Sequence, residues 1–187
     1  MVDPCAAVAY RAVMRFSPSL ALFPLIFLYH PTVQGQTLEV AGDLGYACFA
    51  QSQRHHGAFG GMSAKVLFSD LFGVDARYNL SEHRSKGDSQ SVHRMSLGAV
   101  ANLDVFEYIP WASLSATVLA AHGDHLVDPL NYGIGFGLGF DRLIDPSWSV
   151  GFAAQFDQIF GQERFPAYML MGIRVGYRWR LGAEFAP

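Results

Sequence analysis

Residues 131–141 constrain the fold of this chain more than any other segment. They read Asn-Tyr-Gly-Ile-Gly-Phe-Gly-Leu-Gly-Phe-Asp, with glycine at every odd position from Gly133 to Gly139 and a large apolar residue at every even position from Tyr132 to Phe140. A period of two residues indicates a β-strand. A strand on a soluble core usually carries polar residues on its second face, but this one carries almost no side chains there. We therefore expect a bulky group from elsewhere in the fold to lie over the glycines.

The same alternation recurs in about seven other segments between residues 37 and 181. Each segment is close to the roughly 9–11 residues that a tilted strand needs to cross a bilayer. No stretch has sustained helical periodicity, and turn signals such as residues 69–71 separate the segments. Successive strands of this kind predict an all-β, antiparallel up-and-down meander. We expect eight strands that close into a transmembrane β-barrel, with both chain ends on the same side.

The two faces of the expected strands differ in charge. Charged side chains recur on one parity, whereas the strand centres of the other parity carry none. A charge facing lipid costs about 2–4 kcal/mol at the midplane, whereas acids and bases inside a barrel can pair. An eight-stranded barrel is only just wide enough to be filled by side chains, so we predict a plugged interior. The glycines of residues 131–141 would give space to long Arg and Lys side chains. The predicted interior charge network comprises Glu39, Asp43, Lys65, Asp75, Arg77, Arg94, Asp104, Asp157, Arg174, Arg178 and Arg180.

Aromatic residues gather at the strand ends that have the shorter connections. Amphipathic rings prefer a membrane–water interface, so we interpret this set as one lipid-interface girdle. The predicted girdle comprises Phe68, Phe72, Trp111, Phe140, Trp148, Tyr177 and Trp179. Trp111 has inward parity, so its alternative place is the floor of the barrel. Tyr132, Phe156 and Tyr168 would form a sparser girdle at the opposite rim, where longer connections are expected at 51–57, 82–91, 121–131 and 158–166.

The start of the chain has the pattern of a secretory signal peptide. Basic residues precede the apolar stretch 20–29, and small or modest residues precede a cleavage site that we place after Gly35. Met14 is an alternative start of the translated chain. An uncleaved membrane anchor is less suited to so short an apolar stretch. We expect residues 1–35 to be the signal peptide and residues 36–187 to be the barrel domain.

The chain resembles the small outer-membrane β-barrel families, namely the outer-membrane protein A transmembrane domain and the opacity-type porin-like proteins. The resemblance covers nearly the whole mature chain. It is carried by the Gly-x-Gly-x-Gly strand with the Asp-Arg-Leu-Ile-Asp-Pro-Ser-Trp-Ser-Val-Gly-Phe segment that follows, and by the final strand at 173–181. It implies a place in the bacterial outer membrane and insertion by the barrel-assembly machinery. The chain departs from the usual pattern because residues 182–187 follow the last strand.

Motifs for catalysis or nucleotide binding are lacking in the sequence. There is no phosphate-binding loop, no His-Glu-x-x-His and no Gly-x-Ser-x-Gly, and there is no basic patch for nucleic acid. We expect no cofactor and no enzymatic activity, with a lipid-modifying barrel enzyme as a minor alternative. His122 and His125 are candidate metal ligands in a set of loop histidines, although histidine as an ordinary polar loop residue is the favoured interpretation. The full set of mature histidines is His55, His56, His83, His93, His122 and His125.

These patterns favour an outer-membrane protein with a structural or surface-interaction role. Its loops would contact ligands, partner cells, outer-membrane lipids or lipopolysaccharide, and we expect it to be a monomer. Two alternatives stay open. A narrow porin-like channel for small solutes or ions would use the inward charges to line a path. A secreted, soluble lipocalin-like binding barrel would instead point apolar residues inward and charges outward.

Overall fold

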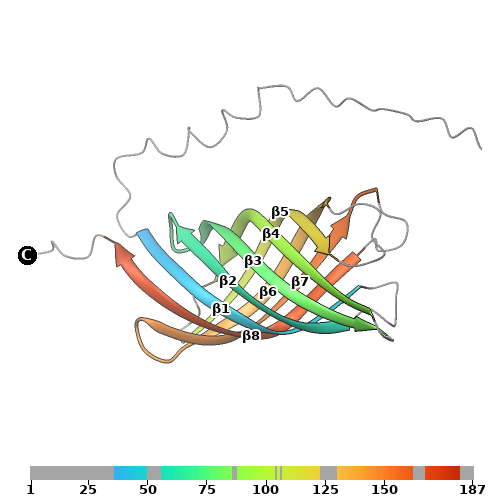
Figure 1. Ribbon diagram of the computed structural model, residues 1–187. Helices are drawn as coiled ribbons and strands as arrows, with labels where there is room; N and C mark the ends of the chain where they lie inside the picture. The colour runs from blue at the N-terminus through green and yellow to red at the C-terminus, as the bar shows by residue number, and fades with distance from the viewer. Residues whose placement is uncertain are drawn as a thin grey trace, which may run out of the picture. The chain divides into compact units, whose positions relative to one another are not determined.

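The computed structural model describes residues 36–49, 56–85, 88–103, 105, 107–122, 130–161 and 167–181. These residues form eight antiparallel strands that pair in chain order, and β8 also pairs with β1, so the sheet closes into a barrel (Figure 1). The predicted eight-stranded up-and-down barrel is confirmed. The predicted signal peptide lies outside the described residues. The strands are β1 Gln36–Phe49, β2 His56–Leu67, β3 Phe72–Ser85, β4 Asp88–Asn102, β5 Tyr108–His122, β6 Leu130–Leu143, β7 Trp148–Ile159 and β8 Ala167–Leu181.

The connections define two ends of the barrel. Three connections, at residues 68–71, 103–107 and 144–147, lie at the end that also holds Gln36 and Leu181, and we call it the turn end. We call the opposite end the loop end. The turns are held by side chains, since the Asp145 carboxylate accepts hydrogen bonds of 2.7 Å from two backbone amides.

One expected loop is instead largely β-structure. The sequence pattern predicts a connection at 82–91, but β3 continues to Ser85 and β4 begins at Asp88, and these two residues are register partners. The segment was expected to be a loop because its residues are mostly polar and lack the apolar alternation of the wall.

The register places acids beside bases on the inward face. Glu39 of β1 is the partner of Lys65 on β2 and of Arg178 on β8. Lys65 is in turn the partner of Asp75 on β3. Because side chains of directly opposed residues lie about 4.5–5.5 Å apart at Cβ, the register alone brings these charges within reach of one another.

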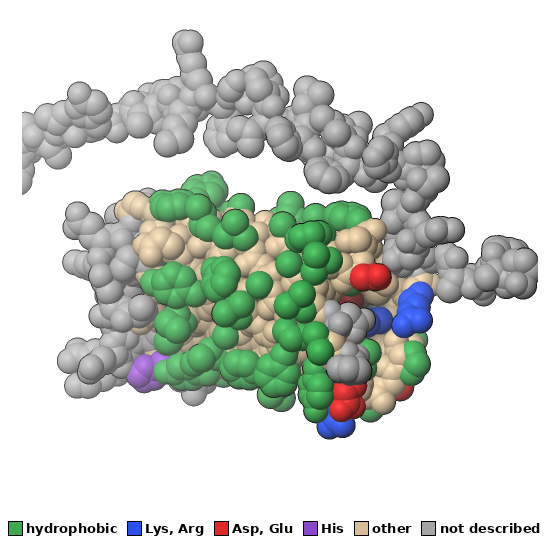
Figure 2. Space-filling model, turned by 180° about the vertical axis from the view of Figure 1, so that it is seen from behind, with side chains coloured by type: hydrophobic (Ala, Val, Ile, Leu, Met, Phe, Trp, Pro, Cys, Tyr) green, Lys and Arg blue, Asp and Glu red, His purple; other side chains and the backbone are tan. Residues whose placement is uncertain are grey.

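The outer wall is apolar. Large hydrophobic side chains such as Leu44, Met62, Leu97, Leu114 and Ile173 are each more than 60% exposed along the strands. Figure 2 shows hydrophobic side chains across the wall on this side of the barrel, with the acidic and basic side chains visible from this side gathered at one end. This arrangement is the opposite of the lipocalin-like alternative and is typical of a wall that faces hydrocarbon. No helix in the described ranges is long and apolar enough to span a membrane.

The interior has two different halves. The turn-end half holds buried charged residues, whereas the loop-end half holds a cluster of buried, mostly apolar side chains that the sequence analysis did not anticipate. The loop-end cluster comprises Ala47, Phe49, Phe59, Val92, Leu119, Ala121, Ile159, Tyr168 and Leu170. The expectation that Tyr168 belongs to an outer rim is wrong. Its ring is fully buried, with its centroid 4.8 Å from that of Phe49, because its parity on β8 is that of the inward residues Leu170 and Arg174.

Candidate functional site

A charge cluster around Glu39 occupies the turn-end half of the interior. The fully buried Glu39 carboxylate receives Lys65 Nζ at 3.3 Å, Arg174 Nη2 at 3.1 Å and Arg178 Nε at 2.7 Å. The three cations come from β2 and β8, which flank β1 in the closed sheet. One acid therefore neutralises part of the charge of three bases, of which Lys65 and Arg174 are buried and Arg178 is partly exposed.

Arg174 connects this cluster to two further acids. Arg174 Nη2 also donates to Ser63 Oγ at 3.0 Å, and Arg174 Nε lies 3.8 Å from Asp141 Oδ1. Asp43 is the register partner of Arg174 and is buried. The acids Glu39, Asp43, Asp75 and Asp141 face the bases Lys65, Arg77, Arg174 and Arg178, so their formal charges cancel.

The indole of Trp111 lies inside the barrel and is only 3% exposed, so its predicted place at the lipid interface is wrong. The cations Arg77, Arg174 and Lys65 lie over the indole, at 4.5, 5.4 and 5.5 Å from the ring centroid. Such contacts between a cation and an aromatic face are favourable, most of all away from water. The inward parity of Trp111 on β5 explains its position, and the predicted alternative inside the barrel is the one observed.

The same indole fills the space over Gly137 and Gly139 of β6. A Cβ atom added to Gly139 would collide with carbons of the Trp111 ring, and one added to Gly137 would lie 3.3 Å from Trp111 Cζ3. Glycine is therefore required at 139 by a close approach and not by its backbone conformation. The expectation that Arg and Lys side chains occupy this space is wrong in its detail. The Trp111 indole lies over Gly137 and Gly139 with the cations against it, and the Asp157 carboxylate lies over Gly135.

A second charged layer lies between the Glu39 cluster and the loop-end cluster. Arg94 and Asp157 form two contacts, Nε to Oδ2 at 2.6 Å and Nη2 to Oδ1 at 2.8 Å. Thr117 Oγ1 donates to Asp157 Oδ1 at 2.9 Å, and Arg94 Nη1 donates to Asn79 and Ser96 at 3.1 Å each. This geometry is the two-pronged arrangement that makes arginine–carboxylate pairs strong.

The predicted interior residues do not form one network. Asp75 and Arg77 pair with each other on β3. Arg180 is exposed at the end of β8 and, within the described part of the chain, makes no ion pair with the cluster. Asp104 lies outside the described residues. Asp141 was missed because it was assigned to a turn, although it keeps the inward parity of the glycines that precede it.

The other predicted interface aromatics lie on the outer wall toward the turn end. Trp148 and Tyr177 stack edge to face at 4.9 Å between ring centroids, and Tyr177 and Trp179 do so at 4.5 Å. The remaining three are exposed phenylalanines, namely Phe68, Phe72 and Phe140.

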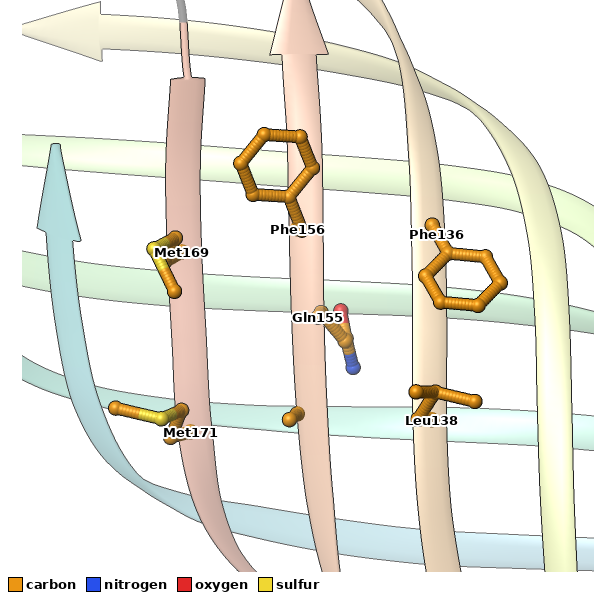
Figure 3. A pocket seen from close by; sticks show the side chains of 7 residues that line it. Phe136, Leu138, Gln155, Phe156, Met169 and Met171 are labelled. Carbon is orange, nitrogen blue, oxygen red and sulfur yellow. The ribbon is translucent and has the colours of Figure 1, made fainter. Parts of the chain in front are cut away.

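The outer wall also has a shallow apolar groove of about 120 Å³ across β6, β7 and β8 (Figure 3). Phe136 and Leu138 border it on β6, and Met169 and Met171 border it on β8. Gln155 belongs to the inward face and is buried. The groove therefore presents hydrocarbon to the surrounding bilayer and offers no group for chemistry.

The histidines are not gathered at one site. His55 and His125 lie outside the described residues, so the His122/His125 metal hypothesis stays a prediction. His83, which was expected in a loop, is buried inside the barrel, with Nε2 at 2.9 Å from Ser81 Oγ. Within the described ranges no group of three or more His, Cys, Asp or Glu side chains is placed to hold a metal ion.

Three solved structures with similar folds are all outer-membrane barrels or barrel domains. Neisserial surface protein A has a TM-score of 0.60 and 13% identity, covering 79% of this chain and 97% of its own. The second is Ail, the attachment invasion locus protein of Yersinia pestis, in complex with the heparin analogue sucrose octasulfate. It has a TM-score of 0.57 and 12% identity, covering 78% of this chain and 99% of its own. The N-terminal β-barrel domain of Pseudomonas aeruginosa OprF has a TM-score of 0.53 and 14% identity, covering 78% and 100%. No family model and no curated protein matches the sequence.

Proposed function

We propose that this chain, an eight-stranded β-barrel of the bacterial outer-membrane type, has a structural or surface-interaction role. In this proposal the barrel conducts no ions and is not an enzyme. The turn end, with its short connections, would face the periplasm. The loop end would face the exterior, where the connections are available to ligands or partners.

The non-conducting role rests on the large side chains that are buried inside the barrel. Arg94, Arg174, Lys65 and Tyr168 are each less than 2% exposed, and they come from β2, β4 and β8 and from three layers of the interior. The charges in the turn-end half lie against one another and against Trp111, which supports a plug in preference to a hydrated path. The apolar loop-end cluster adds a layer that ions do not cross readily.

A monomeric state is supported by closure of the sheet. The pairing of β8 with β1 leaves no strand edge for a partner chain. We propose that the chain is inserted as a monomer by the barrel-assembly machinery after removal of residues 1–35.

Contacts at the loop end are proposed because the wall faces lipid and the interior is occupied. The connections at 50–55, 86–87, 123–129 and 162–166 are the parts of the chain that would reach beyond the wall; they lie outside the described residues. The crystal structure of Ail with a heparin analogue supports the idea that a barrel of this size can present a ligand-binding surface.

The narrow channel is the competing function, and planar-bilayer recording distinguishes the two. We expect the refolded wild-type barrel to insert without steady single-channel steps, because buried side chains occupy its cross-section. An open porin recorded under the same conditions serves as the control for detecting conduction, and vesicle flotation establishes that this barrel has inserted. Steady steps in the wild type, with a size that shifts in an Arg178→Gln variant, would favour the channel instead.

A further inference from the structure

Three polar rings meet on the outer wall near the loop end, one from each of β3, β4 and β5. The Tyr78 hydroxyl lies 2.8 Å from Nδ1 of His93. The His93 and His122 rings meet edge to face, with their centroids 5.5 Å apart. We call Tyr78, His93 and His122 the outer-wall histidine cluster.

The cluster stands at the border of the apolar wall. His93 has the same parity as the exposed Met95 and Leu97 on β4, and His122 has the same parity as the exposed Leu114 on β5. In a bilayer this border is the depth of the lipid headgroups.

The turn-end border of the apolar wall provides a comparison, because its outward rings are those of an ordinary membrane–water interface. Its outward rings are Trp148, Tyr177, Trp179 and several phenylalanines, none of which gains a positive charge. At the loop end, two imidazoles lie side by side instead. Imidazole is a side chain that can carry a positive charge, and an anion between two charged rings would offset their mutual repulsion.

The hydrogen bond to Tyr78 occupies one ring nitrogen of His93. The Nε2 of His93 and the ring of His122 are then left for a ligand, and a protonated imidazole donates from both nitrogens. Phosphate suits such a site because it offers several acceptor oxygens and carries a negative charge.

The groups around the cluster set its charge. Among the side chains that the structure describes, the titratable outward neighbours are Tyr78 and Glu82 on β3 and His122 itself on β5. Arg84 has the same parity on β3, and its side chain is not among those described. Glu82 is the register partner of Ser91, which is the partner of His122, so two strand spacings of about 4.8 Å separate their backbones. The negative charge of Glu82 therefore weakens anion binding at the cluster, but its side chain does not fill the space between the two histidine rings. Leu80 and Ala120, the partners of His93, are uncharged.

We propose that the outer-wall histidine cluster is a binding site for the phosphate of a phosphorylated lipid headgroup, of the lipopolysaccharide kind, in the outer leaflet. The site rests on the outer-membrane orientation proposed above. It lies on the lipid-facing wall, and so it is separate from the interior.

Native mass spectrometry of the refolded barrel in mixed micelles tests this site with bisphosphorylated lipid A as the probe. We expect the wild type to retain roughly tenfold more lipid A at about pH 5.5 than at about pH 8, since a charged hydrogen bond is worth about 1.5–3 kcal/mol. Lipid A stripped of its phosphates should show no such pH dependence. Millimolar inorganic phosphate should compete weakly, because it lacks the acyl chains that hold the lipid at the wall.

The variants make the assignment specific. The His93→Gln/His122→Gln double variant should lose the pH dependence. The matched control is His56→Gln, because His56 is an exposed rim histidine that stacks on Tyr46 and, among the described residues, makes no ring contact with another histidine, and it should behave as the wild type does. Glu82→Gln should retain more lipid A at about pH 8.

Three outcomes would overturn the site: equal retention by the double variant and the wild type, equal retention of dephosphorylated lipid A, or displacement by inorganic phosphate at the concentration of the lipid. Heat-modifiable migration in gels establishes that each variant is folded. A barrel that inserts into vesicles without binding lipid A refutes this site alone, whereas failure of the wild type to insert refutes the proposed function.

Discussion

Replacing Glu39 with alanine is expected to destabilise the folded barrel by about 3–5 kcal/mol, the usual cost of removing one partner from a buried ion pair. The change leaves Lys65, Arg174 and Arg178 close together, with the carboxylate that they share removed. Like charges in a medium of low polarity repel strongly. Asp141 still lies 3.8 Å from Arg174 Nε, but among the described residues it forms no ion pair with Lys65 or Arg178. Urea-induced unfolding from lipid vesicles, followed by tryptophan fluorescence, would measure the free energy of unfolding.

The matched control is Glu107→Ala. Glu107 also pairs with an arginine, with its carboxylate 3.3 Å from Arg142 Nη2, but both side chains are more than half exposed. An exposed pair of this kind contributes about 0–1 kcal/mol. If the two alanine variants lost equal stability, the Glu39 cluster would not be a buried network and the description of the interior would be wrong.

Replacing Leu114 with arginine is the second change with a large expected effect. Leu114 lies near the middle of β5, is 62% exposed and faces away from the interior. In a membrane barrel an arginine at the midplane costs about 2–4 kcal/mol, since the guanidinium leaves water for hydrocarbon. The same unfolding measurement in vesicles would show the loss.

Leu103→Arg provides the comparison at a different depth. Leu103 is similarly exposed, at 57%, but it follows the last residue of β4 at the turn end, where headgroups and water are near. The cost there should fall to about 0–1 kcal/mol. Equal and small effects at both positions would mean that water, and not lipid, surrounds the wall.

Much of the barrel could be predicted from alternation alone. The parity of each strand gives the direction of its side chains, so the inward acids and bases and the outward apolar band follow from the sequence, as does the strand count. Register could not be predicted in this way, and register decides that Glu39 meets Lys65 and Arg178 while Arg94 meets Asp157 in another layer.

The occupants of the interior were harder to predict than its lining. The glycines of β6 indicate that something bulky lies opposite, but a missing side chain does not identify its neighbour, and Trp111 fills the space. Amphipathic rings usually lie at a membrane–water interface. Trp111 and Tyr168 were assigned to an interface on that general preference, although both have inward parity. Both rings are buried because strand parity is a geometric constraint, whereas the interface preference of an aromatic ring is only a tendency.

The three tryptophans give the most direct test of the account, because they are the only tryptophans in the sequence and they lie on different sides of the wall. Trp148 and Trp179 are 48% and 43% exposed on the outside, and Trp111 is 3% exposed on the inside. Variants that keep one tryptophan each, with phenylalanine at the other two positions, would be refolded into vesicles containing brominated lipids. The account predicts strong fluorescence quenching of Trp148 and Trp179 and little quenching of Trp111. Quenching of Trp111 as strong as that of Trp148, or no quenching of any tryptophan, would contradict a membrane-spanning barrel with a filled interior.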